Sequence, residues 1–267
     1  MQLSVRRHWT LGALASLLAC LAAGQAAQAA SIAALQDGKI IVCIDTQQMR
    51  VTRTTALAGG ASLLGIDVRP ADGKLYGLTP EGGVVTLDAR TGKWEKKSQL
   101  TEKLPGGVTF AVDFNPAADR LRVLTNTGMS YRINVEDGKT TVDGSLKFAD
   151  ADPHKGLTAN VIAAAYSNSY AGSKETTLYD IDRGTAALLK QAPPNDGTLN
   201  TIGKLGVSLD GPVAFDIAAD GKGGNTGWML VGGALYTIDL ASGQAKSAGK
   251  IAGLEGPLLD LAILPSE

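Results

Sequence analysis

Apolar and polar residues alternate with a period of two in short runs along this chain, and Gly, Asp, Asn and Pro separate the runs. Runs of this kind, rich in Val, Ile, Leu, Tyr and Thr, are typical of β-strands joined by tight turns. The clearest group lies between Leu64 and Trp94, with strand-like segments at 65–70, 74–79 and 84–94. No stretch after the N-terminal region carries an apolar stripe of helical period and length, so the pattern predicts a nearly all-β protein.

This group of strands occurs five times, with a period of roughly 45 residues, which is typical of repeat architectures. Later copies begin near residues 110, 161 and 213, and the fifth copy is split between the opening strand 258–264 and segments 31–35, 40–45 and 51–55. A repeat shared by both ends of the chain closes a ring and leaves no exposed strand edge. We therefore predict a single β-propeller domain over 31–267, with five blades of about four antiparallel strands each.

An aspartate recurs in the first strand of four copies, on the face opposite the apolar residues. Alternation places Asp67, Asp113, Asp216 and Asp260 toward the central channel, whereas the third copy has Ala165. The carboxylates either accept hydrogen bonds from backbone N–H groups of neighbouring blades or form a cation site. Ca²⁺ or Mg²⁺ would suit such oxygen ligands, and no other cofactor is expected.

A second polar series is expected at the ends of the third strands. It comprises Asp45, Asp88, Asn134, Asp182 and Asp239. Asp and Asn side chains accept hydrogen bonds from backbone groups in the turns that follow them. This series is predicted to be structural.

The second copy concentrates polar groups at Asn115, Asp119, Arg120 and Arg122. The two arginines are two residues apart and therefore share one side of a strand. They pair with Asp119 or Asp113 in a structural network, or they bind an anionic, carboxylate-bearing ligand through bidentate hydrogen bonds. These four residues are the candidate ligand-binding set.

The N-terminus has the pattern of a secretory signal peptide over residues 1–30. Arg6 and Arg7 precede an apolar stretch, 11–23, and small residues allow cleavage near Ala29 or Ala30. We expect a periplasmic or secreted protein, with a lipid anchor on Cys20 as the alternative. No second apolar span follows, so no transmembrane segment is expected after cleavage.

Charge and side-chain chemistry narrow the function classes. The net charge is −1, no block of basic residues suggests nucleic-acid binding, and His154 and Cys43 are single in the chain that follows the signal peptide. A nucleophile-elbow motif, Gly-x-Ser-x-Gly, is absent from the sequence. These features favour a binding function over catalysis.

Four segments resemble the DUF4394 family of exported bacterial proteins of unknown function. They are 65–76, 112–123, 177–182 and 193–199. The resemblance implies export and a propeller-like β fold, and it implies no activity.

Three functions are consistent with the sequence. We expect a monomeric, non-catalytic binding module for a protein or small-molecule partner. The alternatives are a structural envelope protein without a discrete ligand and a carboxylate- or metal-dependent hydrolase at the channel mouth.

Overall fold

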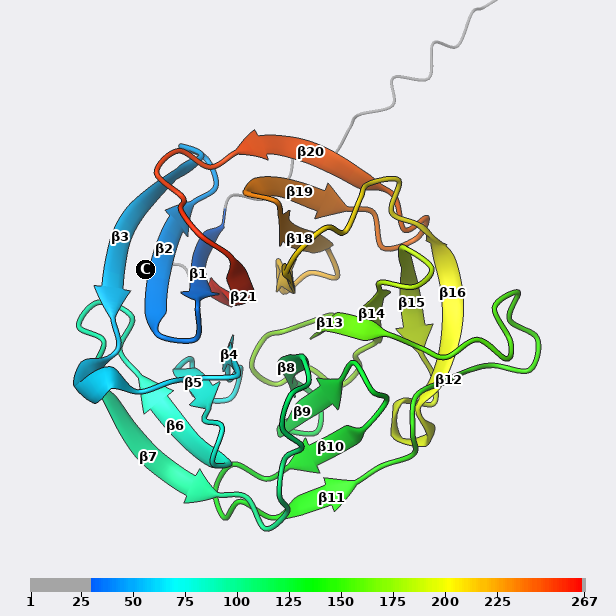
Figure 1. The fold of residues 1–267 in the computed structure, drawn as a ribbon, viewed down its shortest axis with the longest axis horizontal. Helices are drawn as coiled ribbons and strands as arrows, with labels where there is room; N and C mark the ends of the chain where they lie inside the picture. Colours follow the sequence, from blue (N-terminus) through cyan, green and yellow to red (C-terminus); the bar gives the residue numbers. More distant parts are fainter. Residues whose placement is uncertain (1–29, 266–267) are drawn as a thin grey trace, which may run out of the picture.

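Five β-sheets are arranged in a ring around a central axis in this protein (Figure 1). The computed structural model describes residues 30–265. Within that range, helical structure is limited to two short 3₁₀ turns, η1 (Ala58–Gly60) and η2 (Pro194–Asp196). The predicted all-β, five-bladed propeller is confirmed. The predicted signal peptide, apart from Ala30, and Cys20 lie outside the described residues.

The first three blades follow the order of the chain from the channel outward. Blade 1 contains β4 (Gly65–Val68), β5 (Leu75–Leu78), β6 (Gly83–Leu87) and β7 (Trp94–Gln99). Blade 2 contains β8 (Phe110–Asn115), β9 (Arg120–Thr125), β10 (Ser130–Ile133) and β11 (Thr140–Val142). Blade 3 contains β13 (Val161–Tyr166), β14 (Leu178–Asp182), β15 (Ala187–Gln191) and β16 (Thr198–Lys204), with the short β12 (Lys147–Phe148) parallel to β16.

The last two blades complete the ring. Blade 4 contains β17 (Val213–Ala219), β18 (Asn225–Val231), β19 (Ala234–Ile238) and β20 (Ala245–Lys250). Blade 5 contains β21 (Leu258–Leu264), β1 (Ser31–Gln36), β2 (Ile40–Asp45) and β3 (Arg50–Ala56). Strand β21 pairs antiparallel with β1, with Ser31 opposite Leu264, so both ends of the described chain build one sheet as predicted.

Blade 3 departs from the predicted alignment of the repeats. The segment that ends at Asp182 is β14, the second strand, and the third strand is β15. Asp182 was expected at the end of a third strand because Leu178–Asp182 and Leu235–Asp239 both read Leu-Tyr-x-Ile-Asp. Second and third strands share this apolar alternation, so the pattern does not distinguish them.

The inner strands are largely buried on both faces because each lies between two neighbouring blades. Every residue of β4 and β13 is buried, whereas the outer strand β7 is mostly exposed. Five apolar clusters fill the gaps between blades, and Ile66, Phe114 and Phe215 are each no more than 1% exposed. This packing holds the inner strands rigidly around the channel.

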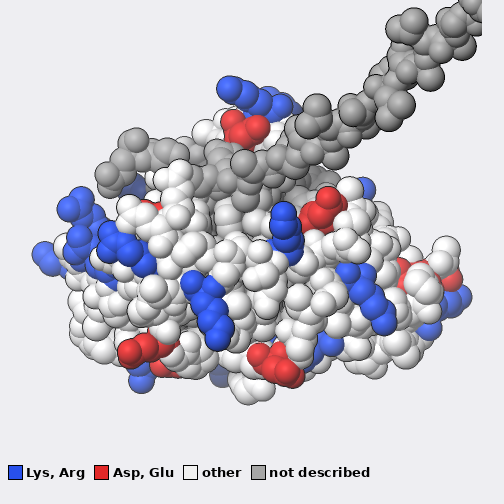
Figure 2. Space-filling view, turned by 90° about the horizontal axis from the view of Figure 1, so that it is seen from above, with Lys and Arg blue, Asp and Glu red and all other residues white. Residues whose placement is uncertain are grey.

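The surface mixes charges of both signs. Figure 2 shows basic and acidic side chains scattered over the visible face rather than gathered in one basic patch. A search of the described residues for a helix long and apolar enough to cross a membrane finds none.

Candidate functional site

The channel aspartates fasten neighbouring blades to one another at four of the five junctions. Asp67 accepts hydrogen bonds from the N–H groups of Val68, at 2.6 Å, and Phe114 in blade 2, at 2.7 Å. Asp113 likewise accepts from Tyr166 N–H in blade 3, at 2.9 Å.

The same arrangement recurs on the other side of the channel. Asp216 accepts from the N–H groups of Ile217, at 2.5 Å, and Ile263 in blade 5, at 2.7 Å. Asp260 accepts from those of Leu261 and Ile66, both at 3.0 Å. Four of the five junctions between blades therefore carry a carboxylate, and Ala165 leaves the junction between blades 3 and 4 without one.

Asp260 stands at a different height from the other three aspartates. The N–H group that donates to the preceding blade belongs to Phe114 in blade 2 and to Tyr166 in blade 3. Each donor directly follows the residue at the level of the ring, which is Asp113 in blade 2 and Ala165 in blade 3. In blade 5 the donor is Ile263, so Ala262 occupies that level and Asp260 lies two residues earlier. The predicted equivalence of all four aspartates is therefore wrong for Asp260, which lies about 7 Å along the strand from the ring level.

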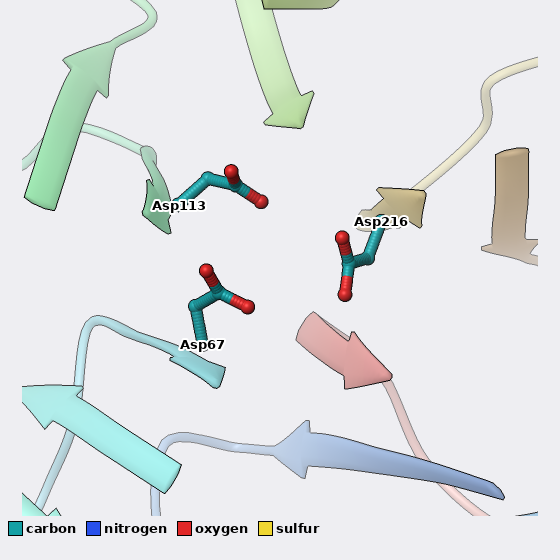
Figure 3. Close-up of side chains that lie close together, drawn as sticks. All are labelled: Asp67, Asp113 and Asp216. Atoms are coloured by element: carbon teal, nitrogen blue, oxygen red, sulfur yellow. The ribbon is translucent and has the colours of Figure 1, made fainter. Parts of the chain in front are cut away.

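Three carboxylates converge at that level. Asp67 on β4, Asp113 on β8 and Asp216 on β17 point toward a common centre (Figure 3). One oxygen from each lies within 4.8 Å of the oxygens of the other two, and each residue is no more than 4% exposed. They form the candidate site, named the aspartate triad below.

Burial raises the pKa of every carboxyl in the triad. Burial and then the negative charge of Asp216 raise the pKa of Asp67 well above its usual value, and burial followed by Asp67 and Asp216 does the same for Asp113. For Asp216, burial raises the pKa to about 6 against the opposing hydrogen bonds from Ile263 and Ile217. The pKa of Asp260 also rises well above its usual value, first through burial. Ionised together, these groups repel one another in a poorly solvated channel.

A cavity of about 290 Å³ opens onto two members of the triad. Asp67 and Asp216 lie in its lining together with residues at the C-terminal ends of the inner strands, and the opening is named the C-terminal mouth. Its walls are largely apolar, including Ile217 and Ile263, whereas Ser169 and Tyr170 come from the loop after β13.

The opposite end of the channel has different chemistry. A cavity of about 270 Å³ there is lined by residues at or before the starts of the inner strands, including Leu64, Phe110, Ile162 and Leu259. The guanidinium of Arg183 also lines it, but donates hydrogen bonds to the carbonyls of Leu209 and Gly211. Acidic side chains therefore line the C-terminal mouth and not this one.

The predicted ligand-binding set is held in contacts within the chain. Arg122 is 1% exposed and donates to Asp143 at 2.6 Å, Ser130 at 2.9 Å and Asn195 at 2.8 Å. Its Nε also donates to the Tyr166 hydroxyl at 3.2 Å. This geometry matches the structural alternative for Arg122, with Asp143 rather than Asp119 or Asp113 as its partner.

The other three members of that set serve separate local contacts. Asn115 accepts from the N–H groups of Ala117 and Ala118, whereas Asp119 forms a 2.6 Å ion pair with Arg69. The hydrogen bond from Arg69 lowers the pKa of Asp119. Arg120 donates to the backbone carbonyls of Ala118 and Asp119. The structure does not bring the four side chains together around one cavity.

The predicted turn-capping series accepts backbone hydrogen bonds throughout. The acceptors are Asp45, Asp88, Asn134, Asp182 and Asp239. His154 lies 3.0 Å from Thr201 Oγ1 and 3.3 Å from Asp152 Oδ1 and packs against Phe148. These are loop-fastening contacts away from the aspartate triad.

One buried acid was missed by the sequence analysis. Asp180 on β14 is fully buried, and neither carboxylate oxygen has a hydrogen-bond partner among the described residues. Burial raises its pKa well above the usual value, and only the charge of Arg122 opposes that rise. The alternation in β14 places residue 180 on the face shared with Leu178, and this signal was available in the sequence.

The sequence matches the family described as Domain of unknown function (DUF4394) over residues 40–262. The chain belongs to this family. The family description gives no activity, and no curated protein matches the chain.

The chain also matches solved structures, all at low sequence identity. A protein of unknown function from Bacteroides thetaiotaomicron is 15% identical, with a TM-score of 0.55, and the match covers 87% of this chain and 64% of that one. An auxiliary nutrient binding protein from Bacteroides ovatus is 19% identical, with a TM-score of 0.46, over 78% of this chain and 52% of that one. Glutaminyl cyclase from Myxococcus xanthus is 14% identical, with a TM-score of 0.42, over 78% and 73%. Likeness at this level concerns the fold alone.

Proposed function

We propose that this DUF4394 protein is an exported, non-catalytic binding module that holds a small hydroxyl-bearing molecule in the C-terminal mouth. The observation that carries the proposal is the cavity of about 290 Å³ with buried carboxylates in its lining. Its volume is at the lower end of the range for small-molecule sites. Export is inferred from the sequence pattern of Arg6-Arg7 followed by the apolar stretch 11–23.

The chemistry of the lining selects the ligand class. Apolar walls, such as Ile217 and Ile263, accept a carbon skeleton, and the carboxylates of Asp67 and Asp216 accept hydrogen bonds from hydroxyl groups. The Tyr170 ring at the mouth offers an additional surface for such a ligand. A compact polyol or monosaccharide has this combination of groups.

Binding is tested by calorimetry with a panel of polyols and monosaccharides, first in EDTA and then with Ca²⁺. We expect one class of compound to bind, and Ala171→Trp to abolish binding because Ala171 lines the cavity and is exposed. The matched control is Ala252→Trp, at an exposed position outside that lining, which should bind as the unmodified protein does. A panel without any binder, or equal binding by both variants, overturns the proposal.

A further inference from the structure

No ion pair among the described residues neutralises Asp67, Asp113 or Asp216. The charges that raise the pKa of Asp67 and Asp113 are those of other carboxylates. Elsewhere in the same protein a buried carboxylate is paired, since Asp143 receives hydrogen bonds from both Arg122 and Arg132. Several buried carboxylates without a counter-ion are costly unless protons or a cation neutralise them.

An unused oxygen points to a cation rather than to a purely structural role. Asp113 is 3% exposed and accepts a hydrogen bond on Oδ1 from Tyr166, but its Oδ2 has no protein donor among the described residues. The side chain is directed at Asp67 and Asp216 (Figure 3). This oxygen is not among the fully enclosed side-chain atoms that lack a partner, so it faces space that a cation or water can reach. The oxygens of buried carboxylates normally have a partner, and here that partner is expected from outside the chain.

The hydrogen bonds that fasten the blades leave room for metal ligation. Each carboxylate oxygen has two lone pairs, and in the triad no oxygen accepts more than one backbone hydrogen bond. The same bonds fix the orientation of the three side chains before any ion arrives. The cavity that reaches Asp67 and Asp216 provides the path of entry and space for water or ligand oxygens.

The type of ligand favours Ca²⁺ as the ion. One oxygen from each of the three carboxylates lies within 4.8 Å of the others, which is close enough for all three to bind one cation. Ca²⁺ accepts irregular coordination by carboxylate oxygens at about 2.3–2.6 Å, whereas Mg²⁺ requires nearly ideal octahedral geometry at about 2.0–2.1 Å. We infer that Asp67, Asp113 and Asp216 form a calcium site at the base of the C-terminal mouth.

This inference rests on the proposed function only in that ion and ligand share one cavity. Bound calcium would present open coordination positions to the hydroxyl groups of the ligand. Asp260, two residues from the ring level, adds to the negative potential without being one of the three ligands.

The first test is calorimetric titration of the EDTA-treated full-length protein with CaCl₂ alone, together with thermal melts in EDTA, Ca²⁺ and Mg²⁺. We expect one calcium per chain and, at saturation, a rise in Tm of about 5 °C or more, because an ion that binds only the folded state stabilises it. Mg²⁺ should give a smaller rise. The absence of heat and of any Tm shift up to about 10 mM Ca²⁺, well above the Kd of typical extracellular calcium sites, overturns the inference.

Variants locate the ion. Asp113→Asn keeps an oxygen for the Tyr166 N–H but loses the charge, so calcium affinity should fall at least about tenfold while the protein stays folded in EDTA. Asp180→Asn is the matched control, since it removes another buried carboxyl that is outside the triad and should leave the calcium titration unchanged. If Asp113→Asn fails to fold, Asp67→Asn takes its place with the same expectation. Unchanged affinity in a folded triad variant refutes the site.

The two proposals fail separately. Calcium binding without any organic binder removes the proposed function and leaves the ion site. A polyol or sugar that binds equally well in EDTA, with no calcium heat, removes the ion site and leaves the proposed function.

Discussion

Replacing Arg122 tests whether the polar group of blade 2 holds the protein together or binds a ligand. The change is Arg122→Met, which keeps an unbranched apolar stem and removes the guanidinium with its four hydrogen bonds. Arg120→Met is the matched control on the same strand, because Arg120 is only half-buried and its guanidinium donates only to backbone carbonyls.

The expected loss follows from the contacts. Removing one partner of a buried ion pair costs about 3–5 kcal/mol of unfolding free energy. Asp143 keeps the two hydrogen bonds from Arg132, at 2.7 and 2.9 Å, so the lower limit of about 3 kcal/mol applies. For a domain of this size each kcal/mol shifts Tm by about 2–4 °C, which gives a fall of about 6–12 °C. The Arg120 variant should stay within about 0.5 kcal/mol of the unmodified protein.

Urea unfolding followed by tryptophan fluorescence and thermal melts provide two independent readouts. Equal m-values would show that the variants unfold from comparably compact states. A loss of less than about 1 kcal/mol of unfolding free energy for Arg122→Met would refute the structural assignment. Removing a buried side chain with these hydrogen bonds leaves its partners unsatisfied and costs more than that. That result would favour the alternative that Arg122 binds an anionic ligand.

The remaining predictions concern backbone space and pH. Gly138→Ala should destabilise by about 2–4 kcal/mol, because a Cβ there would lie 1.9 Å from the Gln99 carbonyl oxygen at a φ of 75°. Gly107→Ala, with φ 73° and open space, should cost about 1 kcal/mol; equal losses in chemical denaturation would contradict the steric argument. Because its pKa is raised, the Asp180 carboxyl binds a proton more tightly in the folded state than in the unfolded state, where its pKa is about 3.9. The free energy of unfolding therefore falls as the pH rises from about 3.9 through the pKa of the folded state. Asp180→Asn should therefore narrow the gap in Tm between pH 5 and pH 8 measured in EDTA, and an unchanged gap would show that this carboxyl does not titrate differently on folding.

The propeller was predictable because its signal is local and repeated. Strand alternation and Asp-Gly turns depend on short-range chemistry, and the split fifth copy indicated how the ring closes. The third copy was misaligned because Leu178–Asp182 and Leu235–Asp239 carry the same alternation, although one is a second strand and the other a third. A pattern of period two specifies which face a residue occupies and does not specify the position of its strand in the sheet.

The sequence predicted which face of the inner strands carries the channel aspartates, but it did not predict their levels along the channel axis. Alternation correctly placed Asp67, Asp113 and Asp216 toward the channel. Asp260 and Ala262 are two residues apart on the same face of β21, so the sequence alone could not decide which one joins the ring level. The partner of Arg122 was missed for a related reason, since Asp143 follows β11, and only the folded chain brings it to β9.

Closure of the ring through β1 and β21 also has a kinetic consequence. The pairing joins residues 31–36 to 258–264, and contacts so distant in sequence slow folding because a large loop must close before they form. A chain made from its N-terminus produces β1 early and β21 last among the described strands, so one edge of blade 5 stays unpaired throughout synthesis. That edge is the segment on which a chaperone would act to prevent association between incomplete chains.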